Sequence, residues 1–379
     1  MRRFFLVSLL ALPLACAPMA PPRHKGGIDP SMGLYTREDE DLVVADAMPL
    51  VLCRTYLSSD RVSRHFGIGT THPGEWYLIG DGATFQWAEL ILSDGGRIHF
   101  DRISAGTAAS DAVFEHRATP TRFRGARLHR EPNGWAMDFA DGGTALFKHC
   151  HPNNSDVCSI LDLRDKAGHG IHYDRDATGR LLEMRGDTQK ITFHYDSAGR
   201  IDRAGDSFGR SVEYRYDDRG RLTRVRGFDG VVRQYGYTER DEMARIEEPR
   251  MTIENRYDGS GRVIRQRTRY PDSDEIDSIG FDYTVRGSQV IQTDTTEYDG
   301  THTRTIYNPR HYRTSEVFDA DGEHPVTVSF ERDGETNVTR AFHVQCANGL
   351  KKDADPRVFQ HFRSEPDGWS IANWACRGQ

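Results

Sequence analysis

Hydrophobic and polar residues alternate along short stretches of this 379-residue chain, in the pattern of β-strands with one buried face. Ile191, Phe193 and Tyr195 fall on one face of such a stretch, and Thr192 and His194 fall on the other. Aspartate- and glycine-containing turn signals separate the stretches, and long helical periodicity is missing. The pattern predicts an all-β protein built from antiparallel hairpins.

One hairpin pattern recurs five times, with a tyrosine ahead of each turn. The lead tyrosines are Tyr173, Tyr195, Tyr216, Tyr237 and Tyr257, at spacings of 22, 21, 21 and 20 residues. A fixed period of this length is typical of repeat proteins, in which each unit buries its apolar face against its neighbours. We therefore expect a stack of similar hairpins.

The turn of each repeat is predicted from an aspartate followed by a glycine. Aspartate can accept a hydrogen bond from a backbone N–H two residues on, and glycine takes positive φ without steric cost. The expected turn residues are Asp174 and Gly179, Asp196 and Gly199, Asp217 and Gly220, and Asp258 and Gly261. After the third turn, Leu222 and Val225 fall out of phase on the strand, which predicts either a β-bulge or a local twist there.

The repeated tyrosines have two interpretations. As core residues, their rings cover apolar surface while the hydroxyls reach a polar edge. As a binding site, a row of tyrosines could stack on sugars. We favour the core, because the tyrosine position is tied to the turn. Residues 171–270 hold 20 arginines and one lysine, which suits packing of guanidinium groups on these rings.

These five units resemble the YD repeat of the bacterial Rhs family, which wall-associated proteins, insecticidal toxin complexes and animal teneurins share. Upstream, residues 29–39, 41–44 and 49–59 resemble the domain that commonly precedes Rhs repeats. The resemblance implies an N-terminal β domain at residues 34–158 and seven or eight YD repeats at residues 159–345. The repeats would form a curved, incomplete β-spiral, and residues 346–379 would cap it. A shell-terminating Asp-Pro-x-Gly-Leu motif is missing, so we expect no closed toxin capsule.

The first residues have the order of an export signal. Arg2 and Arg3 precede an apolar run at residues 4–15 that is too short for a membrane span. Cys16 follows a small residue, as in the lipobox of bacterial lipoproteins, although Pro13 departs from that pattern. We expect residues 1–16 to be removed up to an acylated Cys16, and residues 17–33 to act as a tether. Ala17 then favours the outer membrane, and the alternative is ordinary cleavage near residues 17–20, giving a secreted or periplasmic protein.

Export makes disulfides plausible for the other five cysteines. Cys150 and Cys158 bracket a turn-rich loop, and Cys346 and Cys376 bracket the C-terminal tail, so we expect these two pairs. Cys53 is left over as a free, buried small hydrophobic residue.

The sequence around the first pair also raises a zinc site. His149, Cys150 and His151 lie near Cys158, but paired Cys and His spacings of structural zinc sites are missing. We expect the disulfide, no metal and no cofactor.

Charge and chemistry favour binding over catalysis. The net charge is −7, and the arginines of the repeats alternate with acidic residues, which argues against nucleic acid as a partner. Our leading hypothesis is a non-enzymatic, envelope-anchored binding or scaffold module whose partner is an envelope protein or glycan, captured at an open sheet edge near residues 326–330. The alternative is a toxin-related accessory or a hydrolase of envelope polysaccharide. It rests on scattered carboxylates that could pair: Asp138, Asp141, Glu183 and Glu213.

Overall fold

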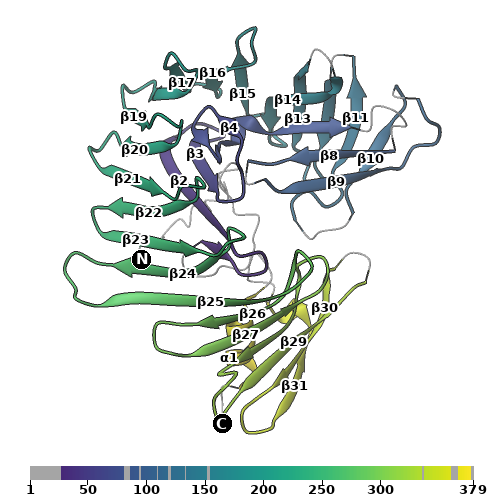
Figure 1. Ribbon diagram of the computed structural model, residues 1–379. Coiled ribbons are helices and arrows are strands. Elements are labelled where there is room, and N and C mark those ends of the chain that lie inside the picture. The colour runs from purple at the N-terminus through teal and green to yellow at the C-terminus, as the bar shows by residue number, and fades with distance from the viewer. Residues whose placement is uncertain are drawn as a thin grey trace, which may run out of the picture.

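The protein is described by a computed structural model, which covers residues 27–80, 86–93, 95–108, 110–117, 121–132, 134–151, 154–334, 337–359 and 366–376, without the side chains of residues 149–157. Its elements are almost all β-strands, which confirms the predicted fold class (Figure 1). The described exceptions are two 3-10 turns, η1 (Pro73–Glu75) and η2 (Pro356–Phe359), and one helix, α1 (Gly368–Cys376). No described helix has the length and apolar character needed to cross a bilayer.

Residues 27–72 form a segment that we call the strap. In Figure 1 it lies inside the curve made by the repeats. Four of its strands form a small antiparallel sheet in the order β1-β2-β3-β6, and β4 pairs with β5. The strap strands are β1 (Ile28–Asp29), β2 (Leu34–Val44), β3 (Leu50–Leu57), β4 (Ser63–Arg64), β5 (Gly67–Ile68) and β6 (Thr70–Thr71).

Eight strands after the strap close into a small barrel. Each strand pairs with the next one, and the ring closes where Leu78 and Tyr77 of β7 pair with Cys158 and Ser159 of β14. The strands are β7 (Tyr77–Gly80), β8 (Trp87–Ile91), β9 (Arg97–Arg102), β10 (Val113–Glu115), β11 (Arg127–Glu131), β12 (Gly134–Asp138), β13 (Thr144–His151) and β14 (Asn154–Arg164). Buried Phe100, Phe114, Trp135 and Phe147 fill its interior.

The sheet continues beyond the barrel as a stack of antiparallel hairpins, each strand paired with the next. The same strand β14 pairs with β15, so the expected domain boundary at residue 158 lies inside a shared strand. The first strands are β15 (Gly170–Arg175), β16 (Leu181–Arg185), β17 (Lys190–Tyr195), β18 (Ile201–Asp206), β19 (Ser211–Tyr216), β20 (Leu222–Arg226), β21 (Val232–Tyr237), β22 (Met243–Glu248), β23 (Met251–Tyr257) and β24 (Val263–Arg269). The stack ends with β25 (Ile276–Arg286), β26 (Gln289–Thr296), β27 (His302–Tyr307), β28 (Arg313–Phe318), β29 (Val326–Arg332), β30 (Thr339–Gln345) and β31 (Lys351–Ala354).

The repeated turns use one set of bonds. In the turn after β19, Asp217 Oδ1 accepts the backbone N–H groups of Arg219 and Arg221 at 3.0 and 2.9 Å, and its Oδ2 accepts from the Arg221 guanidinium at 2.7 Å. Gly220 has φ +81°. The same bonds recur at Asp196 and Asp258. A carboxylate that binds both backbone and guanidinium explains why arginine follows the glycine.

The first repeat corrects our assignment of Asp174 as a turn residue. Asp176, not Asp174, accepts the backbone N–H groups of Thr178 and Arg180. When the first and second repeats are aligned on their turn aspartates, Arg175 occupies the position of Tyr195. Tyr173 then occupies the position of Phe193. The sequence Tyr-Asp-Arg-Asp offers two aspartates, and alignment on the tyrosine selected the wrong one.

A β-bulge follows each of these turns. Tyr216 pairs with Leu222 and Arg215 with Arg224, so Thr223 is the extra residue, and both Leu222 and Val225 are buried. This is the bulge, one of the two irregularities predicted from their phase. Equivalent shifts follow the turns after Arg175, Tyr195, Tyr237 and Tyr257. The bulge changes which side chains face inward.

We expect Gly220→Val to lower the free energy of unfolding by about 1–3 kcal/mol, because a β-branched residue is strained at positive φ. The nearest atom to an added Cβ is 3.7 Å away, so crowding adds little to the backbone strain. Asp218→Ala changes an exposed position of the same turn and should cost less than about 0.5 kcal/mol. Urea denaturation of both variants measures the difference, and equal losses would refute this turn geometry.

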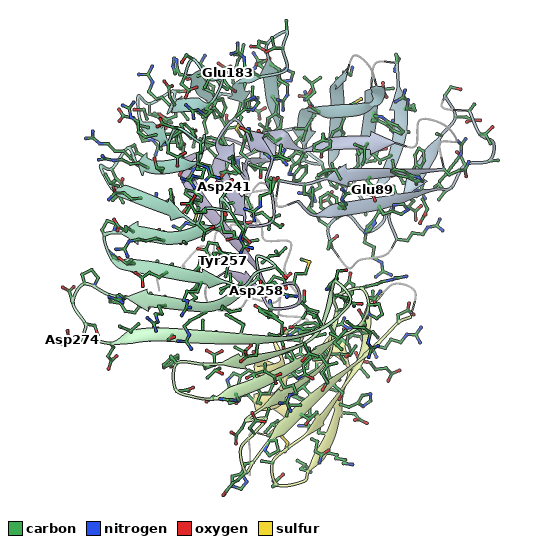
Figure 2. All side chains as sticks on the ribbon, in the orientation of Figure 1. Glu89, Glu183, Asp241, Tyr257, Asp258 and Asp274 are labelled. Atoms are coloured by element: carbon green, nitrogen blue, oxygen red, sulfur yellow. A yellow bond between two sulfur atoms is a disulfide. The ribbon has the colours of Figure 1, made fainter. Side chains whose placement is uncertain are left out.

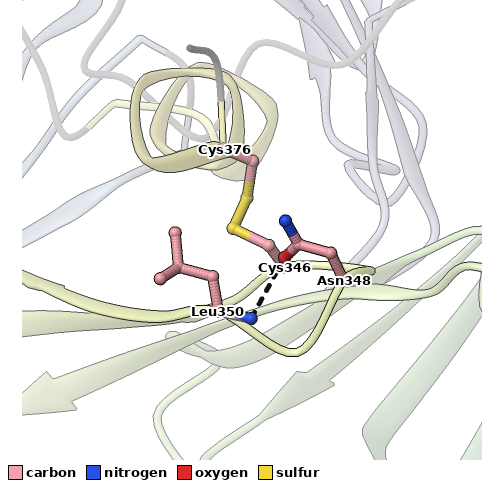
Figure 3. The surroundings of a disulfide bond; sticks show 4 residues. All are labelled: Cys346, Asn348, Leu350 and Cys376. Atoms are coloured by element: carbon pink, nitrogen blue, oxygen red, sulfur yellow. Dashed lines mark hydrogen bonds between the residues drawn. A yellow bond between two sulfur atoms is a disulfide. The ribbon is translucent and has the colours of Figure 1, made fainter. Parts of the chain in front are cut away.

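The described part of the C-terminal tail packs on the last hairpin. Helix α1 and η2 place Ile371, Ala372 and Phe359 against Val328 and Phe342 of β29 and β30. A disulfide joins Cys346, in the turn after β30, to Cys376 at the end of α1 (Figure 3). In the same turn, the backbone N–H of Cys346 donates to the Leu350 carbonyl at 2.8 Å.

The expected open edge near residues 326–330 is wrong. Strand β29 pairs on both sides, with β28 and with β30, and β30 pairs in turn with β31. The turn Cys346-Ala347-Asn348-Gly349-Leu350 adds a further strand because Gly349, with φ +86°, acts like the glycine of the repeats. Strand β31 has four residues, two of them lysines, and such a short charged strand disfavours pairing with another chain.

Cys53 also differs from expectation. It is buried, as predicted, but it is disulfide-bonded and not a free thiol. Cys158 is disulfide-bonded as well, which removes it as a zinc ligand. Cys16 and the side chains of His149, Cys150 and His151 lie outside what the structure describes.

Candidate functional site

The strap binds the inner face of the hairpin stack. The first residue after a repeat turn has a backbone N–H that the bulged hairpin does not use, and the strap accepts it. Ile201 N–H donates to the His65 carbonyl at 2.7 Å and Val263 N–H donates to the Gly33 carbonyl at 2.8 Å. Met243 N–H donates to the Tyr56 hydroxyl at 2.9 Å. Buried N–H groups need partners, so the strap completes the hydrogen bonding of three repeats.

A buried charge cluster lies at the centre of this interface. Arg54 of β3, 3% exposed, donates from Nη2 to Asp41 Oδ1 of β2 at 3.0 Å and lies 3.6 Å from Asp39. From the hairpins, Tyr214 donates its hydroxyl to Asp41 at 2.8 Å and Tyr235 donates to Asp39 at 3.1 Å. The Arg54 guanidinium also lies over both tyrosine rings, 5.6 and 5.9 Å from their centroids. Strap and repeats therefore share one hydrogen-bonded ionic centre.

The pKa shifts agree with a cluster that is charged at neutral pH. Burial raises the pKa of Asp39, but Arg54 and Arg37 more than offset this and hold it below its usual range. Burial also raises the pKa of Tyr235, to about 12, although Arg54 opposes the rise. Asp39 is thus ionised and Tyr235 is neutral near pH 7.

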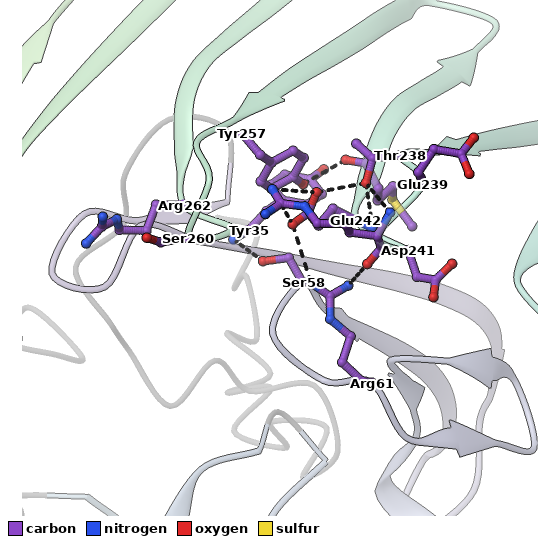
Figure 4. Close-up of polar contacts among 12 residues, drawn as sticks. Tyr35, Ser58, Arg61, Thr238, Glu239, Asp241, Glu242, Tyr257, Ser260 and Arg262 are labelled. Atoms are coloured by element: carbon purple, nitrogen blue, oxygen red, sulfur yellow. Dashed lines mark hydrogen bonds and ion pairs between the residues drawn. The ribbon is translucent and has the colours of Figure 1, made fainter. Parts of the chain in front are cut away.

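Further contacts hold the strap along the turn edge of the stack (Figure 4). Arg61 forms an ion pair with Glu242 at 3.4 Å, and Glu242 is 1% exposed. The Thr238 hydroxyl donates to the other carboxylate oxygen of Glu242 at 2.7 Å. In this fourth repeat, Thr238 replaces the turn aspartate and Asp241, with φ 63°, replaces the glycine. Arg240 of the same turn lies 3.1 Å from Glu242, so the strap adds a second cation to this carboxylate.

The repeated tyrosines belong to the fold. Each hydroxyl donates to a backbone carbonyl of the preceding hairpin: Tyr195 to Leu181 at 2.7 Å, Tyr216 to Ile201 at 2.6 Å, Tyr237 to Leu222 at 2.7 Å and Tyr257 to Met243 at 2.8 Å. The turn arginine of the preceding hairpin covers the ring in three cases, Arg180 over Tyr195, Arg200 over Tyr216 and Arg221 over Tyr237. Each tyrosine is therefore a clamp between neighbouring repeats, in line with the core interpretation.

One described group of side chains has the composition of a metal site. His65, His72 and Glu75 bring ligand atoms within 4.8 Å of one another. However, His72 Nδ1 accepts the Gly74 N–H at 3.2 Å, which leaves the ring proton on Nε2, the atom that faces Glu75 at 3.9 Å. A protonated ring nitrogen cannot bind a metal. The Arg175 guanidinium donates to the neighbouring Gly74 carbonyl and adds positive charge. We assign this group as a polar cluster under the strap.

The buried His72 predicts acid sensitivity. Burial lowers its pKa to about 4, although Glu75 opposes the shift. Between pH 6.5 and 4 the unfolded chain then binds more protons than the folded one, so stability falls as the pH falls through this window. The loss is at most about 3 kcal/mol. His72→Leu should flatten the pH dependence of the urea midpoint there, whereas His99→Gln, at an exposed histidine, should not. Parallel profiles for His72→Leu and wild type would contradict this role.

The four carboxylates of the hydrolase alternative occupy separate structural positions. Asp138 lies 3.6 Å from His129 of the barrel, and Asp141 accepts the Gly143 N–H in a turn. Glu183 forms an ion pair with Lys190 at 2.8 Å on the first hairpins, away from the barrel (Figure 2). Glu213 lies on β19, opposite Arg203 and Arg226. The structure brings none of these four into a catalytic pair.

Comparison with known proteins agrees with the repeat geometry. Residues 195–232 match the RHS repeat family. This part of the chain therefore contains an RHS repeat. Residues 25–100 match a domain of unknown function, DUF6531, so this domain spans the strap and the start of the barrel. A search of curated proteins found no match to this chain.

Two solved structures match most of this chain at low sequence identity. A crystal structure of TcdB2-TccC3-TEV matches 84% of this chain at 11% identity, with a TM-score of 0.42. A Photorhabdus luminescens Tc holotoxin pore matches 83% at 11% identity, also with a TM-score of 0.42. This RHS-repeat chain covers 19% of each of those chains.

Proposed function

We propose that this RHS-repeat protein is a non-enzymatic binding or scaffold module, held at the bacterial envelope by a lipid on Cys16. The observation that carries the scaffold role is the strap, which fills the inner face of the hairpin stack with buried hydrogen bonds and one ionic centre. A face occupied by the protein's own chain offers a cargo or substrate little access. The outer face and the turns are then left for a partner, an envelope protein or glycan.

Anchoring is proposed from the sequence alone, on the order of basic residues, apolar run and Cys16. We expect the wild type in the membrane fraction with an acylated N-terminal peptide, and Cys16→Ser in the soluble fraction. Fractionation with mass spectrometry measures both. A variant that stays with the membranes, together with a wild type whose N-terminal peptide carries no acyl group, would contradict the anchor.

Turnover of a cell-wall polymer that Glu183→Gln abolishes would contradict the non-enzymatic role.

A further inference from the structure

The outer face of the hairpin stack carries arginines that form no ion pair with a carboxylate of the described residues. In residues 171–270 the sequence gives 20 arginines and one lysine against 18 acidic residues, close to balance. In the structure, the turn aspartates bind the turn arginines of their own repeats. Asp176, Asp196 and Asp217 pair with Arg180, Arg200 and Arg221. These turn carboxylates are therefore not available to the arginines on the strands.

Two pairs of like charges face each other across strands. Arg215 of β19 is directly opposite Arg224 of β20, and Arg256 of β23 is directly opposite Arg265 of β24. All four side chains are exposed, on the face away from buried Tyr214 and Val225. Across the strands and turns that the structure describes, none of the four is within ion-pair distance of a carboxylate. Side chains so placed are about 5 Å apart at Cβ, and like charges there reduce stability.

The surroundings of the two pairs show that this is not a general property of the sheet. Between them, Arg245 occupies the equivalent position of the intervening hairpin, opposite Gly236. It forms ion pairs with Glu247 at 2.7 Å and Glu254 at 2.6 Å. At this intervening position the arginine is therefore neutralised by carboxylates, which stabilises the sheet. Two uncompensated pairs, at equivalent positions two hairpins apart, indicate an external anion.

We infer that these four residues, the arginine face, bind a linear polymer of phosphate groups. This inference rests on the proposed binding role, but it assigns the outer face a phosphate polymer in place of an envelope protein or glycan. A guanidinium donates two parallel hydrogen bonds to a phosphate, and two guanidiniums opposite each other can hold the same group. Since neighbouring strands are about 4.8 Å apart, the two pairs are separated by about 20 Å along the stack. A chain with regularly spaced charges can reach both.

Other polyanions fit this face less well. The hairpins curve around the strap (Figure 1), so the arginine face is on the convex side, where a flat bilayer touches a narrow strip. Its neighbours on the strands, Thr223, Gln234 and Gly236, offer neither an apolar side chain to enter a membrane nor an aromatic ring on which bases could stack. The exposed rings of Phe208 and Phe228 lie in the turns at the strand ends, beside Glu213 and Arg226. A flexible phosphate chain needs neither.

The test is binding of inorganic polyphosphate to the full chain at several salt concentrations. We expect Arg215→Gln with Arg224→Gln to weaken binding by about tenfold or more and to lower the salt slope by about 1.5. Thermal stability should stay equal or rise, because a repulsive pair is removed. The control, Arg117→Gln with Arg127→Gln, removes the same charge from exposed arginines that pair with Glu115, and should leave binding unchanged.

Three results would overturn the inference: no binding by the wild type, equal loss in the control, or tighter binding of anionic vesicles or single-stranded DNA through the same arginines. The assay uses protein in solution, so its outcome does not depend on whether Cys16 is acylated. Membrane release of Cys16→Ser with normal polyphosphate binding would separate the two proposals.

Discussion

Arg54→Ala is expected to lower the free energy of unfolding by about 3–5 kcal/mol, because removing one partner of a buried ion pair leaves the other charge uncompensated. Asp41, whose side chain is 0% exposed, would lose the guanidinium that binds it. Asp39 would still have Arg37 at 2.7 Å. The variant also loses the cation between Tyr214 and Tyr235. Urea denaturation at pH 7 measures the effect.

Two further variants make this prediction specific. Arg64→Ala removes an arginine from the same strap, but its ion pair with Asp60 is partly exposed, so we expect a loss below about 1 kcal/mol. Adding Asp41→Asn to Arg54→Ala should recover part of the stability by removing the unpaired charge. Similar losses in Arg54→Ala and Arg64→Ala would mean that the strap is not held by a buried ionic centre.

Replacing both Cys346 and Cys376 by serine should release the C-terminal tail. In the chain-entropy treatment, whose mechanism is disputed, a disulfide that closes a loop of this length contributes about 3–4 kcal/mol. Helix α1 would then leave Val328 and Phe342 exposed. Because each unit of a repeat array contacts mainly its neighbours, the first five repeats should stay folded.

Limited proteolysis with mass spectrometry tests this expectation, with cleavage in residues 346–376 and protection of residues 171–269. Val358→Ala, at an exposed position of the same tail, is the matched control and should change nothing. The proposal of an independent, disulfide-held tail fails if the serine variant loses the whole stack together, or keeps the tail protected.

The sequence predicts what depends on local chemistry. The period, the strand alternation at Ile191 and Phe193, the positive φ of Gly220 and the bulge at Thr223 all follow from neighbouring residues. The turn of the first repeat could not be predicted in this way, because Asp174 and Asp176 both fit the sequence pattern. The hydrogen bonds of the turn are made by Asp176.

Contacts between distant residues could not be predicted in the same way. The strap meets repeat residues more than 120 positions away, for example where His72 lies beside Phe193, and where His311 approaches the Ser31 carbonyl, 280 positions away. The acidic run of β2 could have indicated this contact. Asp39 and Asp41 are two residues apart on a strand that has a neighbour on both sides, and both are buried. The uncompensated pairs of the arginine face were missed because counting charges along the chain does not show which carboxylates the turns use.

Hydrogen exchange at the amides of Ile201, Met243 and Val263 tests the role of the strap most directly. Each of these N–H groups donates to the strap and not across its own hairpin. We expect all three to be protected in the wild type and to exchange much faster in Arg54→Ala, while the paired amides within β19 and β20 keep their protection. Exchange of the three amides at the rate of exposed turns in the wild type, or no change in Arg54→Ala, would contradict a strap that binds the inner face of the repeats.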